Sequence, residues 1–198
     1  GKGARALVED ARSNVAKLVG AEPEWVIFCG SGTEADNQVL RCCTAETVLI
    51  SAIEHDAVRF ARADSRKIGV TGNGVVDLNA LDEALCQASG LTLISVMAAN
   101  NETGVMQPWR ELADLCRERG IHFHCDATQW VGKLSSSGLS ACSSFSASAH
   151  KFGGPKGVGI LVSNQARSFV LGGSQESGRR GGTENYPGIK AMSVACEI

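Results

Sequence analysis

The sequence has no long hydrophobic run, no marked excess of charge of either sign and no C-x-x-C motif. The longest apolar segment, near residues 91–99, is too short and too polar to span a membrane. The formal net charge of −2 argues against a nucleic-acid or other polyanionic partner, because such partners need a basic face. Residues 1–12 look helical and include Glu9 and Asp10, so they do not read as a secretory signal.

Eight cysteines are present, but their spacing favours neither a zinc site nor a dithiol redox motif. Cys42 and Cys43 are adjacent, and the others are scattered along the chain. Several lie in apolar segments, where we expect them to serve as small core residues. A reducing, cytoplasmic compartment is therefore expected.

Strand-like and helix-like segments alternate along the chain. The predicted strands cover residues 24–29, 47–51, 66–70, 91–96, 121–125, 144–148 and 157–162. The predicted helices cover residues 5–19, 33–41, 56–63, 78–88 and 109–119, with Asp77 as an N-cap and Gly120 as a C-terminal stop. This alternation predicts an α/β fold with a mostly parallel sheet flanked by helices, in one domain over residues 1–198. In such sheets, ligands bind beyond the carboxyl ends of the strands.

Two residues at predicted strand ends point to a particular chemistry. Lys151 lies between the strand at 144–148 and a glycine-rich loop, and Asp126 follows the strand at 121–125. A carboxylate placed there is expected to be partly buried and to need a partner. A lysine that forms a Schiff base and an aspartate that keeps a pyridine nitrogen protonated are the pair that pyridoxal phosphate requires. Taken singly, Lys151 also fits a solvated loop lysine, and Asp126 also fits a helix cap.

Two glycine-containing segments are candidate anion sites. The turn at 30–33 leads from a strand into a helix, where free N–H groups and the Thr33 hydroxyl would favour a phosphate. The alternative is a tight turn with Thr33 capping the helix. Ser148 could hydrogen-bond the same phosphate, and His150 could orient Lys151 or cover the site. The segment 178–183 is a second candidate anion loop, or else a mobile basic loop.

The remaining polar candidates have structural alternatives. His55 fits a capping or packing residue, or else an aromatic plate on a cofactor ring and a proton carrier, with Asp56 as an N-cap. Asn101 fits a polar turn, or else an amide near the cofactor's phenolic oxygen. His122 and His124 share one strand face, but no third ligand has a helpful spacing, so we predict no metal site.

Six motifs, in order, resemble the cysteine desulfurase and selenocysteine lyase family, within the class V aminotransferase group of fold type I pyridoxal phosphate enzymes. They cover nearly the whole chain, and their combination is specific although each is weak alone. The motifs are S-G-T-E-A-D-N from Ser31, S-A-I-E-H-D from Ser51, A-N-N-E-T-G-V from Ala99, H-C-D-A-T-Q from His124, S-A-H-K-F-G-G-P-K-G-V-G from Ser148 and R-R-G-G-T-E-N from Arg179.

The resemblance implies residue roles, an activity and partners. Lys151 would carry pyridoxal phosphate, and His55 would stack on its ring as the second catalytic residue. The implied cofactor-binding residues are Asp126 at the pyridine nitrogen, Asn101 and Gln129 at the ring oxygen, Thr33, Ser148 and His150 at or beside the phosphate, and Thr183 at the phosphate of the partner subunit in a homodimer. The implied activity converts L-cysteine to L-alanine and persulfide sulfur, for a sulfur-acceptor protein and for iron–sulfur cluster assembly.

The sequence departs from the family at both ends. The family's N-terminal segment is missing before Gly1, and its smaller C-terminal domain is missing after Ile198. In the family that domain carries the sulfur-accepting cysteine and the arginine that grips the substrate carboxylate, and no cysteine here lies in a matching motif. The chain therefore resembles a cofactor domain. A selenocysteine lyase, a class V aminotransferase and a non-catalytic scaffold domain are the alternatives.

Overall fold

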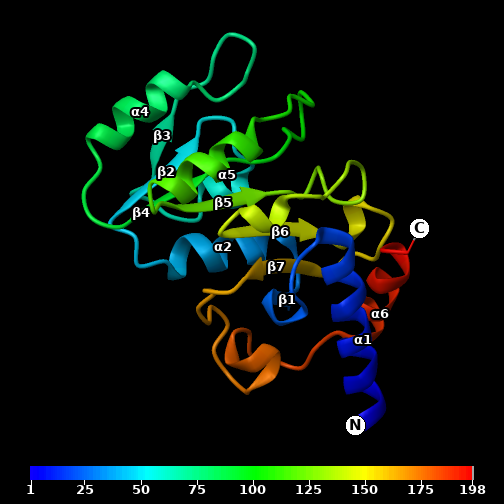
Figure 1. Cartoon of the computed structure of the whole chain (residues 1–198). Coiled ribbons are helices and arrows are strands. Elements are labelled where there is room, and N and C mark those ends of the chain that lie inside the picture. Colours follow the sequence, from blue (N-terminus) through cyan, green and yellow to red (C-terminus); the bar gives the residue numbers. More distant parts are fainter. Residues whose placement is uncertain (198) are drawn as a thin grey trace.

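A single seven-stranded sheet organises the protein in this computed structural model, which describes residues 1–197 (Figure 1). The strand order is β1-β7-β6-β5-β4-β2-β3, and all pairs are parallel except those that β7 makes with β1 and β6. The strands are β1 Val26–Cys29, β2 Thr47–Ser51, β3 Arg66–Ile68, β4 Thr92–Ser95, β5 His122–Asp126, β6 Ser144–Ser148 and β7 Gly159–Ser163. The predicted α/β fold with a mostly parallel sheet is confirmed.

Helices cover both faces of the sheet. The α-helices are α1 Lys2–Val19, α2 Gly32–Cys42, α3 Asp56–Arg59, α4 Leu78–Cys86, α5 Trp109–Glu118 and α6 Tyr186–Ala195. Short 3₁₀ turns lie at η1 Pro23–Trp25, η2 Leu139–Ala141, η3 Ala149–Lys151 and η4 Gln175–Gly178. One face packs its apolar side chains against α1, α4, α5 and α6, and the other packs against α2 and α3. The blue α1 and the red α6 lie side by side, although they come from opposite ends of the sequence (Figure 1).

The helix boundaries follow local chemistry, with some corrections to the sequence expectations. Asp77 caps α4 by accepting the N–H groups of Asn79 and Ala80, as predicted. Ser31, not Thr33, caps α2, and His55, not Asp56, caps α3. Helix α3 ends at Arg59 rather than near residue 63. The first strand starts at Val26, two residues late, because Pro23 opens the η1 turn.

Helix α6 was missed by the sequence analysis. Its second and third residues are proline and glycine, which weaken a helical pattern in isolation. Asn185 supplies the cap by accepting the Gly188 N–H at 3.2 Å. Ile189 and Met192 are buried in the core, so tertiary packing stabilises a segment of weak intrinsic propensity.

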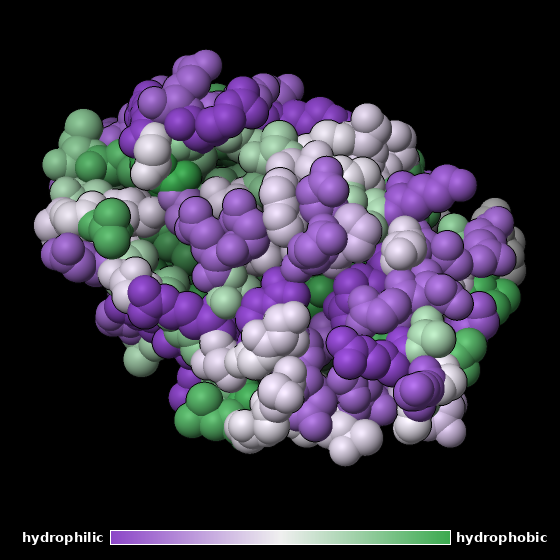
Figure 2. Space-filling model, turned by 60° about the horizontal axis from the view of Figure 1, so that its bottom comes forward, coloured by the Kyte–Doolittle hydropathy of each residue, from purple (hydrophilic) through white to green (hydrophobic). Residues whose placement is uncertain are grey.

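The apolar side chains of the described residues form three core clusters, and the surface is mostly polar. On α1, Val8, Ala11 and Val15 are buried as predicted, with Glu9 and Asp10 exposed. Large exposed apolar side chains, such as Phe60 and Leu171, are scattered. Figure 2 shows the underside of the Figure 1 view, where polar residues predominate and apolar residues form small groups. No helix within residues 1–197 has the length and apolar character needed to cross a membrane.

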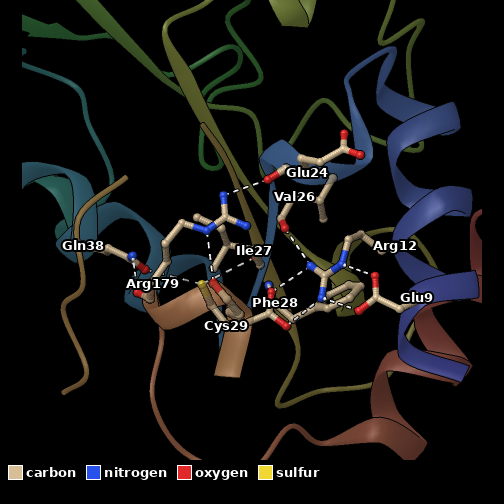
Figure 3. A network of polar contacts seen from close by, with 10 residues as sticks. Glu9, Arg12, Glu24, Val26, Ile27, Phe28, Cys29, Gln38 and Arg179 are labelled. Atoms are coloured by element: carbon tan, nitrogen blue, oxygen red, sulfur yellow. Dashed lines mark hydrogen bonds and ion pairs between the residues drawn. The ribbon is translucent and has the colours of Figure 1, made fainter. Parts of the chain in front are cut away.

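A buried ion pair between Arg12 and Glu176 fixes the η4 turn, which follows the last strand in the sequence (Figure 3). Arg12 of α1 donates two hydrogen bonds to the Glu176 carboxylate, at 2.8 and 2.9 Å, and a third to the Val26 carbonyl at 2.7 Å. Glu176 also accepts the Phe28 N–H at 2.9 Å, and the Arg12 guanidinium stacks over the Phe28 ring. Glu176 and Ser177 have φ values of 48° and 57°, which cost side-chain-bearing residues about 1–2 kcal/mol each. The ion pair holds this strained turn against α1 and β1.

We expect Glu176→Gln to destabilise the protein by about 3 kcal/mol, since removing one partner of a buried ion pair leaves the other charge uncompensated. The side chains of Arg12 and Glu176 are 10% and 1% exposed, so water cannot replace the lost carboxylate. Urea unfolding monitored by circular dichroism measures the difference. The matched control is Asp114→Asn, which removes the acid of the exposed Arg117–Asp114 pair and should leave the midpoint nearly unchanged. Equal effects of the two variants would contradict this account.

Candidate active site

The sheet gathers most of the predicted site residues in one cavity of about 260 Å³. Their elements end at the same edge of the sheet: β5 ends at Asp126, β6 ends at Ser148, and the η3 turn places Lys151 directly after β6. Eight of the nine predicted residues line the cavity, namely Lys151, His55, Thr33, Asn101, Asp126, Gln129, Ser148 and His150. The ninth, Thr183, lies outside it and lines a different hollow with Arg12 and Glu176.

Strand register brings the β1–α2 turn and the end of β6 together at one end of the cavity. Gly159 begins the reversed strand β7 and pairs with Cys29 at the end of β1 and with Ser148 at the end of β6. A Cβ on Gly159 would overlap the backbone of Ser31 and Gly32, so only glycine lets the β1–α2 turn approach so closely. The N-terminus of α2 and the Ser148 hydroxyl therefore face the same space.

The donors at this end suit a phosphate. Thr33 lies in the first turn of α2, where backbone N–H groups and the helix dipole favour negative charge. Ser148 Oγ lies 3.0 Å from His150 Nδ1, so the imidazole and the hydroxyl are held together. Burial, followed by the charges of Lys151 and Lys156, lowers the pKa of His150. A Cβ on Gly32 would lie 3.1 Å from Thr128 Oγ1, which marks a cradle kept open by glycine.

The other end of the cavity suits an aromatic ring with polar substituents. His55 Nδ1 accepts the Ala57 N–H at 3.0 Å, so the cap that starts α3 also fixes the plane of this exposed imidazole. The capping alternative for His55 is therefore correct, and it is compatible with a second role at the cavity. Gln129 Oε1 accepts a hydrogen bond from Lys133 Nζ at 2.5 Å. The N–H groups of the Gln129 amide take no part in this hydrogen bond. Asn101 lies on the exposed turn after β4.

Asp126 is buried at the cavity floor, as expected for a carboxylate at a strand end. It is 6% exposed, and its Oδ1 accepts the Thr128 N–H at 2.9 Å. Burial first, and then the charge of Asp36, raises the pKa of Asp126 above its usual range. A buried carboxylate with few donors favours a cationic partner. The protonated pyridine nitrogen of pyridoxal phosphate is such a partner, so these residues fit that cofactor.

The sequence analysis missed several lining residues. Asp36 of α2 is 1% exposed and lies among β5 and β6 side chains, and Thr128, Met97 and Ala99 complete the wall. Asp36 belongs to the S-G-T-E-A-D-N segment, but helical periodicity alone does not indicate that it faces the sheet. The signal that could have found it is the run of polar residues at alternate positions of β5 and β6, which requires a polar partner above that face.

Comparisons with known proteins identify the family and the fold. The family profile described as "Aminotransferase class-V" matches residues 1–198. A cysteine desulfurase of Klebsiella pneumoniae is 40% identical over 209 residues, covering 98% of this chain and 52% of that protein. A NifS-like protein from Rickettsia africae superimposes with a TM-score of 0.92 at 31% identity, over 99% of this chain and 58% of the other. A structure titled "SspA in complex with cysteine" has a TM-score of 0.88 at 29% identity, over 99% and 61%.

The chain belongs to the class V aminotransferase family. It spans about half the length of the curated relatives it matches, and these relatives are named cysteine desulfurases. Enzymes of this family use pyridoxal phosphate, and the chain has the fold of NifS-like members of fold type I.

Gly32→Val should weaken the binding of pyridoxal phosphate by at least about tenfold, because its side chain fills the cradle between α2 and the residues Thr128 and Ser148. Gly32→Ala should give a smaller loss, since a Cβ alone makes a tight contact. Fluorescence or absorbance titration with the cofactor measures both. Gly3→Ala in α1 is the control, because a Cβ there meets nothing within 4 Å. Unchanged affinity of the Gly32→Val variant would place the phosphate elsewhere.

Proposed function

We propose that this chain is the cofactor domain of a cysteine desulfurase, which converts L-cysteine to L-alanine and releases the sulfur as a persulfide. The observation that carries the proposal is the single cavity in which Lys151, Asp126 and His55 meet beside a phosphate cradle. The names of the relatives favour desulfuration over the action of a selenocysteine lyase or an aminotransferase. The presence of eight of the nine expected residues in one cavity argues against a non-catalytic scaffold.

The proposed roles follow the positions of the side chains. Pyridoxal phosphate supplies an electron sink for the bonds broken at the amino acid. Lys151 holds it covalently through Nζ, and Asp126 keeps the ring nitrogen protonated. The remaining contacts are a stacked imidazole from His55, amides from Asn101 and Gln129 at the ring oxygen, and phosphate contacts from Thr33, Ser148 and His150.

The proposal extends to assembly and partners. Thr183 lies on the loop after η4, outside the cavity of its own chain, which fits a contact with the cofactor phosphate of the partner subunit in a homodimer. The Arg180–Glu34 pair, 2.8 Å apart, ties this loop to the start of α2. A sulfur-acceptor protein, a role in iron–sulfur cluster assembly and a cytoplasmic location belong to the same proposal. The eight free cysteines fit a reducing compartment.

Borohydride reduction in the presence of pyridoxal phosphate should attach the cofactor irreversibly to Lys151. The lysine follows β6 at the cavity that Asp126 also lines, and reduction of a Schiff base leaves a stable amine. Proteolysis and mass spectrometry locate the modified peptide. Lys156→Arg, at an exposed lysine five residues further along, should retain the attachment, whereas Lys151→Arg should lose it. Attachment to a different lysine, or to none, would refute the assignment.

Residues 1–198 alone should bind the cofactor but not release sulfur from cysteine at a useful rate. Sulfur acceptance needs a reactive thiolate near the substrate, and no cysteine among the described residues lines the cavity. Burial raises the pKa of the Cys116 thiol to about 12. Burial also raises the pKa values of the Cys29 and Cys125 thiols well above the usual value for cysteine. Sulfide and alanine can be measured with a reductant present. Rapid turnover that a single cysteine-to-serine change abolishes would show that an acceptor lies within this chain.

A further inference from the structure

A second buried carboxylate, that of Asp36 on α2, lies beside Asp126 and is joined to it by one hydroxyl. Ser146 Oγ lies 2.5 Å from Asp36 Oδ1 and 3.5 Å from Asp126 Oδ1. His124 Nε2 lies 3.2 Å from the same Asp36 oxygen. All four residues are buried, with His124 and Ser146 completely enclosed. Water therefore solvates neither carboxylate well, and both depend on protein groups for compensation.

The hydrogen atoms of this cluster point toward Asp36. Burial lowers the pKa of His124 to about 4, so its ring is neutral and one nitrogen donates while the other accepts. When Asp36 is ionised it can only accept, and Nε2 of the neutral ring then donates to it. His124 Nδ1 then accepts from the Ser144 hydroxyl at 2.9 Å, and Ser144 in turn accepts from His122 Nε2 at 3.0 Å. Asp36 thus receives two donated hydrogen bonds.

Asp126 receives the weaker of the two hydrogen bonds that Ser146 can make. The single Ser146 hydrogen is used in the shorter contact with Asp36, so Asp126 depends on Thr128 for its hydrogen bonds, with the Thr128 N–H 2.9 Å from its Oδ1. Two carboxylates joined through one hydroxyl also repel each other in a medium of low polarity. The charge of Asp36 therefore strengthens the attraction of Asp126 for a cation.

We propose that Asp36 is a positioning residue for Asp126: held in place by Ser146 and His124, it adds the second negative charge that keeps the ring nitrogen of the bound cofactor protonated. The effect on the cofactor's ring nitrogen rests on the proposed function. The electrostatic coupling between Asp36 and Asp126 is a property of the chain itself. Asp36 does this from α2, the helix whose N-terminus faces the opposite, phosphate-binding end of the cavity.

Other charged groups near the pair do not supply the same effect. Glu54 is buried, and burial, with smaller effects of Asp126 and Asp36, raises the pKa of this carboxyl well above its usual range and so disfavours its charged form. Its Oε1 accepts the Met97 N–H at 2.7 Å. Burial raises the pKa of Asp36 to about 7, while the Ser146 hydrogen bond and the charge of His55 act in the opposite direction. Asp36 therefore gains or loses its proton near neutral pH, and the basic residue Lys151 lines the same cavity.

The test uses the full-length protein and two nuclear magnetic resonance measurements. Asp36→Asn keeps the shape and removes the charge, Ser146→Ala removes the bridge, and Asp82→Asn is an exposed control. In the cofactor-free protein, ¹³C-labelled aspartate reports the pKa of the Asp126 carboxyl. In the protein loaded with pyridoxal phosphate labelled at the ring nitrogen, the ¹⁵N shift reports ring protonation against pH.

Asp36→Asn should lower the pKa of Asp126 and lower the pH at which the ring nitrogen loses its proton, each by about one unit, a tenfold change in proton affinity. Ser146→Ala should move the ring nitrogen in the same direction by less, because Asp36 then takes up a proton more readily. Asp36→Glu should restore part of the effect by restoring the charge. The control should match the unmodified protein.

Titrations of Asp126 and of the ring nitrogen that stay unchanged in both Asp36→Asn and Ser146→Ala would overturn the proposal, even if cofactor affinity falls. If Asp36→Asn does not fold, Ser146→Ala alone decides the outcome. A failure of the proposed function looks different: the unmodified protein then forms no borohydride-stable link at Lys151. The ¹³C titration of Asp126 still tests the coupling of the two acids in that case.

Discussion

Burial of carboxylates at the carboxyl ends of the parallel strands is the constraint on which the rest of this structure depends. Asp36, Glu54 and Asp126 are all at most 6% exposed and lie close enough to affect one another's pKa. Removing such groups from water costs several kcal/mol unless partners compensate. Because α2 covers this region, the strands beneath it must supply polar side chains where most sheets place apolar ones.

The alternation of side chains along β5 and β6 meets that demand. Phe123 and Phe145 enter the apolar core on one face, while the histidines and serines between them turn to the face below α2. The reversal of β7 adds the second constraint, since Gly159 pairs with the last residues of both β1 and β6. Two chain segments that are far apart in sequence therefore meet at the end of the cavity whose donors suit a phosphate. The site is thus a consequence of sheet register as much as of its own residues.

Sequence reasoning found most of the elements because their signals are local. Asp77, Gly120 and the apolar stripe of α1 mark helix ends and faces through short-range chemistry. The reasoning failed where distant contacts decide. Helix α6 is stabilised by packing against α1 despite a proline and a glycine in its first turn, and the cap of α3 is a histidine because His55 Nδ1 is free to accept. Motifs located eight cavity residues, whereas Asp36 became visible only when α2 was placed over the sheet.

Two buried clusters of charged residues, one around Arg12 and one around Asp126, differ in how fully their charges are paired. This difference distinguishes a structural cluster from the cavity. Around Arg12, every charge is matched: burial acts to lower the pKa of the guanidinium, but Glu176 and Glu9 more than offset it and raise it. That cluster is complete within the chain and serves to hold the η4 turn. Around Asp126, buried acids lie close together, His124 is neutral, and the Ser146 hydroxyl makes its shorter contact with Asp36. Burial of neighbouring acids raises their pKa values because ionisation there costs free energy, and a bound cation would offset that cost. The two clusters therefore differ in kind, because the Arg12 cluster supplies its own counter-charge, whereas the acids around Asp126 suit a cationic partner in the cavity.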